Sequence, residues 1–203
     1  MSEIIMSPTL WRSCRVLANE RRLRLLKSVL EQGPLSVSEA AQKNKLPLSI
    51  TSAYLRHLNA RGFLRVARHG SHVYYTVGFD PLVQHSEILL TSICEAIQSC
   101  STHREFQRVI QIVTTCTCPR RIKLVRSIAR IADVEYETLR RETGMSKTAL
   151  NRQLGKLLRR HVIQERDEKY RLAPLRDPLL AQLVHICSDD MREEESVGLQ
   201  QRC

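Results

Sequence analysis

The amino-acid sequence predicts a mainly α-helical fold of the α+β class, built from two consecutive copies of one unit. The first observation is internal similarity, because residues 21–30 (RRLRLLKSVL) align without gaps on residues 120–129 (RRIKLVRSIA), 99 positions further along. The same spacing still holds at residues 63–64 and 162–163, with apolar positions matching apolar ones. The second observation is that each copy has three helical patterns followed by two short strand patterns. Similarity at a fixed spacing indicates that one supersecondary unit is used twice.

In the first copy, apolar residues recur at helical spacing, and glycine and proline mark the ends of the helices. Gly33 and Pro34 end the first helical region, since proline lacks an amide donor and restricts the residue before it. Pro47 suits a helix start, and Gly62 ends that helix. Alternating β-branched and aromatic residues then predict a β-hairpin with a turn at Gly70. The expected elements are helices between residues 16 and 30, over 36–43 and over 48–61, and strands over 63–66 and 73–77.

The second copy repeats this order with a shorter hairpin. Pro119 precedes its first helix, Gly144 marks the turn before its last helix, and Ser146 is the expected N-cap of that helix. Beyond the hairpin the spacing shortens, so that Tyr75 lies opposite Tyr170. The second copy has therefore lost a few residues from its hairpin. The expected elements are helices over residues 120–131, 134–142 and 147–160 and a hairpin over 161–172.

Three helices followed by a hairpin is the order of the winged helix-turn-helix fold. Residues 16–26 (VLANERRLRLL), residues 54–64 (YLRHLNARGFL) and the glycine-containing hairpin that ends at Tyr75 resemble the ArsR-type winged helix-turn-helix repressors. The resemblance covers residues 10–100 well and 103–187 more loosely. It implies binding of double-stranded DNA. ArsR-type proteins are usually dimers of single-domain chains, so the resemblance also implies a pseudo-dimer formed within one chain, with homodimerisation of two chains left open.

We therefore expect a first winged-helix domain at residues 9–100, a second at 101–187 and a disordered polar tail at 188–203. Residues 82–97 and 106–113 have apolar residues at helical spacing. Such faces are usually packing surfaces, so they are expected to join the two units or two chains.

The charge of the chain favours a polyanionic partner. It contains 32 Lys+Arg against 21 Asp+Glu, which gives a net charge of +11 and a pI of about 9.7. Nucleic acid is the commonest such partner, although binding to a ribosome or to a membrane surface would need the same sign of charge. No apolar run approaches the roughly 20 residues of a membrane span, and the first ten residues lack a secretory signal. We expect a cytoplasmic, nucleoid-associated protein.

The last helix of each helix-turn-helix and the hairpin, or wing, are where DNA contacts are expected. Asn151 and Arg152 are the sharpest pair, because asparagine suits adenine and arginine suits guanine in bidentate geometry. The second wing has charges of mixed sign and is expected to contact DNA less. The two copies are therefore expected to recognise DNA differently. The candidate DNA-binding residues are Ser49, Ser52, Arg56, His57, Arg65, Arg68, His72, Lys147, Thr148, Asn151, Arg152 and Lys156.

The seven scattered cysteines predict reduced thiols rather than a disulfide framework. Cys116 and Cys118 form the one Cys-x-Cys motif and are weak candidates for a soft-metal or redox site, since two thiolates do not complete a tetrahedral centre. No metal and no cofactor is therefore expected. Phosphate-binding loops, nucleophile elbows and zinc-hydrolase motifs are absent from the sequence, which predicts that the protein is not an enzyme.

The function predicted from the sequence is sequence-specific transcriptional regulation through two winged helix-turn-helix units. The alternative is an architectural, replication or segregation role, in which tandem winged helices bind DNA or serve as a protein-interaction adaptor. A third hypothesis, thiol-based sensing, requires Cys116 and Cys118 to respond to metal or oxidant.

Overall fold

The computed structural model describes residues 10–70 and 72–189. The chain divides into two compact units, a first unit of Met1–Thr117 and a second unit of Cys118–Cys203. The observed division therefore lies at 117/118 and not at the expected 100/101. The expected tail begins within a helix, because residues 188–189 end the last helix, and residues 190–203 lie outside the described part of the chain.

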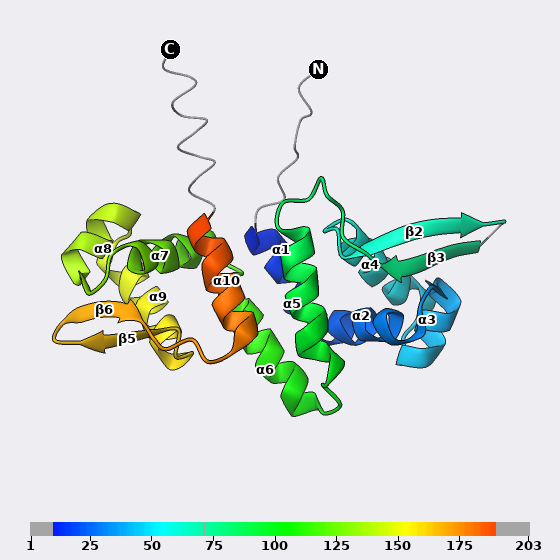
Figure 1. The fold of residues 1–203 in the computed structure, drawn as a ribbon. Coiled ribbons are helices and arrows are strands. Elements are labelled where there is room, and N and C mark those ends of the chain that lie inside the picture. Colours follow the sequence, from blue (N-terminus) through cyan, green and yellow to red (C-terminus); the bar gives the residue numbers. More distant parts are fainter. Residues whose placement is uncertain (1–9, 71, 190–203) are drawn as a thin grey trace, which may run out of the picture. The chain divides into compact units, whose positions relative to one another are not determined.

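The first unit combines six helices and a three-stranded antiparallel sheet within the described residues (Figure 1). The sheet has the strand order β1-β3-β2, so the two-residue first strand pairs with the far strand of the hairpin. The elements are α1 (Leu10–Leu17), α2 (Glu20–Gln32), β1 (Leu35–Ser36), α3 (Val37–Asn44), α4 (Leu48–Asn59), β2 (Leu64–His69), β3 (His72–Val77), α5 (Ser86–Gln98) and α6 (His103–Thr114).

Local sequence signals determine where these helices begin and end. The Asn19 side chain accepts a hydrogen bond from the amide of Arg22 and caps α2, which ends at Gly33 with a φ of 77° that glycine adopts without strain. A capping box starts α3, in which the Ser36 hydroxyl accepts from the Glu39 amide and the Glu39 carboxylate accepts from the Ser36 amide. A strong local signal thus fixes the start of the helix-turn-helix of this unit, which α3 and α4 form.

The core of the first unit lies beneath the helix-turn-helix. Leu23 and Leu26 of α2 and Leu55 and Leu58 of α4 are completely buried, as is Phe63, which enters the hairpin. Burial of side chains from both helices fixes α4 on α2 and leaves its other face exposed.

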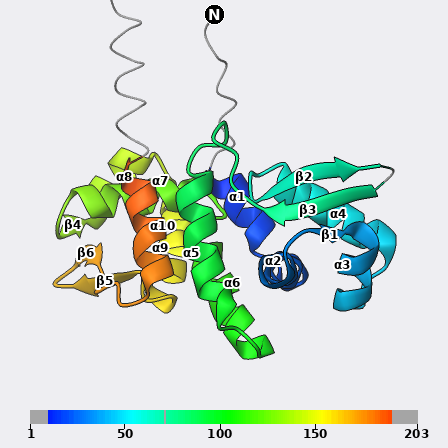
Figure 2. The same cartoon turned by 45° about the vertical axis from the view of Figure 1, so that its right-hand side comes forward.

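Helix α6 belongs to the first unit, although its residues were expected to open the second domain. It packs against α1, α2 and α5, and Figure 2 shows α5 and α6 adjacent. Glu20 of α2 accepts a hydrogen bond from the Gln107 side chain of α6 at 3.0 Å and lies 2.7 Å from Nδ1 of His103. The buried side chains of Phe106, Val109 and Val113 complete this contact.

The second unit has the same order of helices and strands from its first core helix onward. Its sheet order, β4-β6-β5, is that of the first unit. The expected helix over 134–142 begins later than predicted, because Val134 and Glu135 form the short strand that pairs with Tyr170 and Lys169. The elements are α7 (Pro119–Arg130), β4 (Val134–Glu135), α8 (Tyr136–Thr143), α9 (Lys147–Arg159), β5 (Ile163–Arg166), β6 (Lys169–Leu172) and α10 (Pro178–Asp189).

The hairpin of the second unit is shorter than that of the first, with strands of four residues instead of six. Asp167 and Glu168 link its strands with φ values of 50° and 59°. Positive φ at both central residues is the pattern of a type I′ turn, in which Asn-Gly is preferred over Asp-Glu. Behind the hairpin, α10 packs on α7, where the Arg126 Nε donates to the Cys187 carbonyl at 3.0 Å. None of the helices in the described part of the chain is long and apolar enough to cross a membrane.

Candidate nucleic-acid interface

The exposed face of α4 carries the polar side chains that were expected there. Ser49, Arg56 and His57 are exposed and Ser52 is half-buried, whereas the intervening Thr51 is buried and donates its hydroxyl hydrogen bond to the Pro47 carbonyl. The spacing of the exposed residues is that of one helical face. Helix α4 therefore offers hydroxyl, guanidinium and imidazole groups on the side opposite its core contacts.

The corresponding helix of the second unit is more basic. Lys147, Thr148, Asn151 and Arg152 of α9 are exposed, and Lys156 is half-buried. The Ser146 hydroxyl accepts from the Ala149 amide and caps the helix, as expected. The inner face is apolar, and its buried side chains include Leu150, Leu154 and Leu157. At the positions of Asn151 and Arg152 the first unit has Ser52 and Ala53, so the two helices present different chemistry.

In each unit, an arginine from the preceding core helix lies beneath the exposed helix. In the first unit the Arg22 guanidinium lies 5.5 Å from the centre of the Tyr54 ring and donates to the Arg15 carbonyl. Burial lowers the pKa of Arg22, and Tyr54 opposes this shift. In the second unit the buried Arg121 donates through Nη1 to Oε1 of the buried Gln153 at 3.4 Å.

These two contacts occupy equivalent places, since Arg22 matches Arg121 and Tyr54 matches Gln153 at the spacing of the repeat. Sequence reasoning did not single out either arginine. The signal was present in the paired arginines of both copies, RR at 21–22 and at 120–121. In each pair the first arginine is exposed, and the second contacts a side chain of the exposed helix, α4 or α9.

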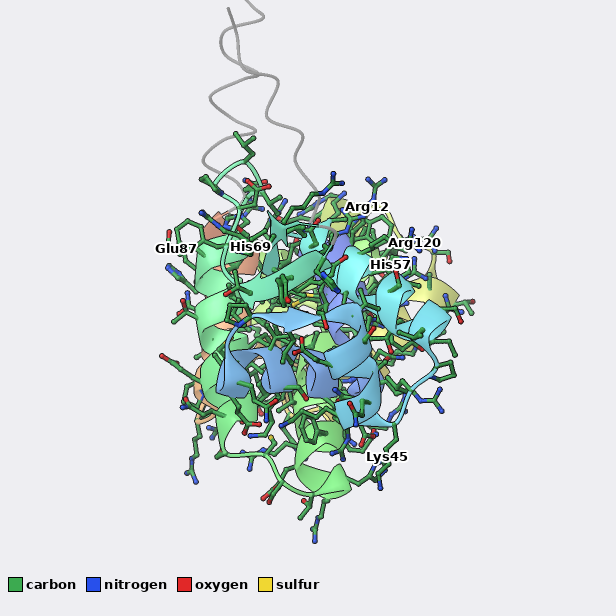
Figure 3. The ribbon with its side chains drawn as sticks, turned by 90° about the vertical axis from the view of Figure 1, so that its right-hand side faces the viewer. Arg12, Lys45, His57, His69, Glu87 and Arg120 are labelled. Atoms are coloured by element: carbon green, nitrogen blue, oxygen red, sulfur yellow. The ribbon has the colours of Figure 1, made fainter. Side chains whose placement is uncertain are left out.

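The first wing contributes fewer free cations than its sequence suggests. Arg65 donates through Nε and Nη2 to the Phe79 carbonyl at 3.0 and 2.9 Å, and its guanidinium lies over the Phe79 ring. That side chain fastens the wing to the segment that follows it. Arg68 and His72 are exposed near the end of the hairpin, together with His69, which is labelled in Figure 3 with His57 of α4. The exposed basic and imidazole side chains of this wing therefore lie near its end.

The second wing has charges of both signs at its turn. Arg166 lies 3.7 Å from the carboxylate of Asp167, and Glu165 accepts a hydrogen bond from the Tyr170 hydroxyl at 3.2 Å. Burial, reinforced by Glu165, raises the pKa of Tyr170 to about 12. This wing is electrostatically less suited to a polyanion than the first.

Cys116, one of the two weak metal candidates, is buried in the first unit, and Cys118 is half-buried at the start of the second. At the spacing of the repeat, Cys116 matches the buried Leu17, so it occupies an apolar core position. Among the described residues, no group of three or more His, Cys, Asp or Glu side chains could hold a metal ion.

The strand order, the three core helices and the hairpin place this chain among the winged helix-turn-helix proteins. It is similar to those of the ArsR type, as its motifs predict. Reduced HlyU from Vibrio cholerae N16961 is 30% identical, in a match that covers 39% of this chain and 83% of HlyU with a TM-score of 0.31.

A second solved structure is the homodimeric winged helix-turn-helix DNA-binding domain, residues 1–100, of Mb0332 from Mycobacterium bovis, described as a possible ArsR-family transcriptional regulator. It is 27% identical, and the match covers 45% of this chain and 84% of that domain with a TM-score of 0.34. No protein-family model matches the chain. No curated protein matches it either.

Proposed function

We propose that this protein is a sequence-specific transcriptional regulator that binds double-stranded DNA through both winged helix-turn-helix units. The observation that carries the proposal is the two-sided character of α4 and α9. Each helix is fixed to its core by buried leucines and presents polar or basic side chains on its other face. A helix held in this way can enter a major groove and read base edges, while nearby cations contact phosphates.

The charge of the chain and the comparisons agree with this proposal. A net charge of +11 favours association with a polyanion through counterion release. The Mycobacterium bovis domain is described as DNA-binding and homodimeric, and we assign the same kind of partner to this chain. A cytoplasmic, nucleoid-associated location would follow.

We propose that the two units recognise DNA half-sites of different sequence. Asn151 and Arg152 of α9 can form bidentate contacts with adenine and guanine, whereas Ser52 and Ala53 of α4 cannot. We propose that the units arose by duplication and act together as a pseudo-dimer. The exposed side chains of Arg68 and His72 on the first wing would contact phosphates in the first half-site.

The test combines in-vitro selection of DNA with salt titrations of the full chain. Binding constants for the selected duplex and for a scrambled duplex of the same composition are measured between 50 and 200 mM salt. A regulator should prefer the selected duplex by about a thousandfold or more. Equal affinity for both duplexes would favour the architectural role, and no affinity at low salt would favour a protein-interaction adaptor.

A further inference from the structure

A groove in the first unit is lined by basic side chains that are not among the candidate DNA-binding residues. It has a volume of about 490 Å³ and lies between α2, the end of α3, the connection from α5 to α6, and Phe106 of α6. That volume lies within the usual range of small-molecule sites. Four cationic side chains line the groove, those of Arg24, Lys27, Lys43 and Lys45.

Two of these four cations are balanced by carboxylates of the same helix. Arg24 pairs with Glu20 at 2.8 Å, and Lys27 pairs with Glu31 at 2.7 Å. Among the described residues, Lys43 and Lys45 form no hydrogen bond or ion pair through their side chains. The groove thus holds two positive charges without a counter-ion from its own lining.

Other polar groups and one ring complete the lining. The Ser28 hydroxyl and the Asn44 amide hydrogen-bond each other at the base of the groove, and Ser99 lies at the α5–α6 connection. Phe106 supplies an apolar wall on which the Arg24 guanidinium is stacked, 4.4 Å from the ring centre. The carboxylate of Glu105, at the start of α6, accepts hydrogen bonds from the amides of Ser101 and Thr102.

The second unit has lost this arrangement at the matching positions. Lys43 is matched by Glu142 and Lys45 by Gly144, while Arg130 replaces Glu31. Arg130 and Glu142 form an ion pair at 2.7 Å, so the charge is balanced within the unit. The uncompensated lysines are therefore particular to the first copy and are not required by the fold.

We propose that the groove of the first unit binds a small multivalent anion that carries phosphate or carboxylate groups. Two lysines without counter-ions match a ligand of at least two negative charges. The lysine ammonium is a compact point charge that pairs well with phosphate and carboxylate groups. Lys45 adjoins the turn between α3 and α4 (Figure 3). If the proposed DNA-binding function holds, the ligand would link this turn to the α5–α6 connection and bias the position of α4.

The test uses the full chain and two probes, inorganic pyrophosphate and citrate, in isothermal titration calorimetry at low salt. The key variant carries K43E and K45G, the residues of the second unit. Glycine suits the left-handed φ of 51° at Lys45, so this variant should fold. The control is R176E, a charge reversal at an exposed arginine of the second unit, which lowers the net charge by two against three in the key variant.

At least one probe should bind wild type with one site per chain. The K43E/K45G variant should then lose tenfold or more in affinity, while R176E changes it less than twofold. Binding of neither probe, or equal weakening in both variants, overturns the proposal. Amide chemical shifts in wild type provide a readout independent of the variants. Shifts should change at residues 43–45 and 98–101, and changes centred on 142–144 would refute the assignment.

A random duplex added to the pyrophosphate complex distinguishes a ligand site from a DNA surface. Coexistence of the two ligands supports the proposal. One-for-one displacement of pyrophosphate would mean that the two lysines contact DNA phosphates and that no separate ligand site exists. A chain that binds a probe but no DNA would refute the proposed function while leaving the anion site intact.

Discussion

Arg152→Ala should relax base preference in one half of the bound DNA and leave the other half unchanged. Arg152 is exposed on α9 and makes no side-chain hydrogen bond or ion pair among the described residues. Its removal should change the free energy of unfolding by less than about 0.5 kcal/mol. Alanine is also the natural residue at the matching position of the first unit, Ala53. Any large effect of the substitution therefore reports on binding and not on folding.

The expected loss follows from the geometry of an arginine that contacts guanine. A bidentate contact contributes about 1–3 kcal/mol of discrimination against the wrong base, which corresponds to roughly 5- to 150-fold in affinity. The variant should lose this factor on the selected duplex. On a duplex in which the contacted guanine is replaced, wild type and variant should bind nearly equally.

Arg159→Ala is the matched control, because Arg159 is exposed on the same helix. It lies seven residues further along, or about 10 Å at 1.5 Å per residue. If it contacts a phosphate, its loss should weaken binding to all duplexes alike and lower the salt slope by about one unit. Fluorescence anisotropy on single-base duplex variants at several salt concentrations measures both effects. Equal, sequence-independent losses for the two variants would refute a base-reading role of Arg152.

Three predictions concern stability. Ser36→Ala removes the cap of α3 and should lower the free energy of unfolding, measured in urea, by about 1 kcal/mol. E135A, at an N-cap without a side-chain hydrogen bond, should lower it much less. Equal losses would contradict the capping argument. The D167N/E168G variant should raise the free energy of unfolding of the second unit by about 1 kcal/mol, because Asn-Gly suits positive φ at both positions. An unchanged midpoint of thermal unfolding would show that the turn is unstrained. Hydrogen bonds at the start of α6 hold the pKa of Glu105 near 2, below its ordinary value of 4.5, so its stabilisation is complete above pH 4.5 and is lost as the pH falls toward 2. E105Q should flatten the pH dependence of the free energy of unfolding between pH 4.5 and 2. The same slope in wild type and variant would contradict this prediction.

The helices and hairpins were predictable because their signals are local. Apolar periodicity, Gly33, Pro47 and the serine caps act within a few residues, and the observed bounds of α4 and α9 differ little from those expected. The short strands β1 and β4 were missed because two residues carry no periodicity. They exist through pairing with a hairpin strand far along the chain, such as Leu35 with Tyr75. Exposure of most candidate residues on α4 and α9 followed from the same periodicity, whereas Ser52 and Lys156 are half-buried.

Contacts between distant side chains were not predictable in the same way. Arg65 looked like a free cation on the wing, yet it is fixed by the Phe79 carbonyl, which the sequence places on no recognisable element. The buried role of Arg121 depends on Gln153, a polar residue on the inner face of a helix that otherwise reads as apolar. Such partnerships depend on tertiary geometry, so a single sequence without that geometry cannot assign them.

The position of α6 explains why the division at 117/118 differs from the expected boundary, and it bears on the proposed pseudo-dimer. At the spacing of the repeat, the buried Leu10, Cys14 and Leu17 of α1 match the buried Val109, Val113 and Cys116. Helix α6 is therefore the sequence counterpart of α1, yet it packs against α1 within the first unit. The second unit accordingly begins at α7, the counterpart of α2. Pairing of equivalent segments is what a dimer of identical chains would produce across its two-fold axis, so the packing of α6 on α1 within the first unit supports the proposed pseudo-dimer.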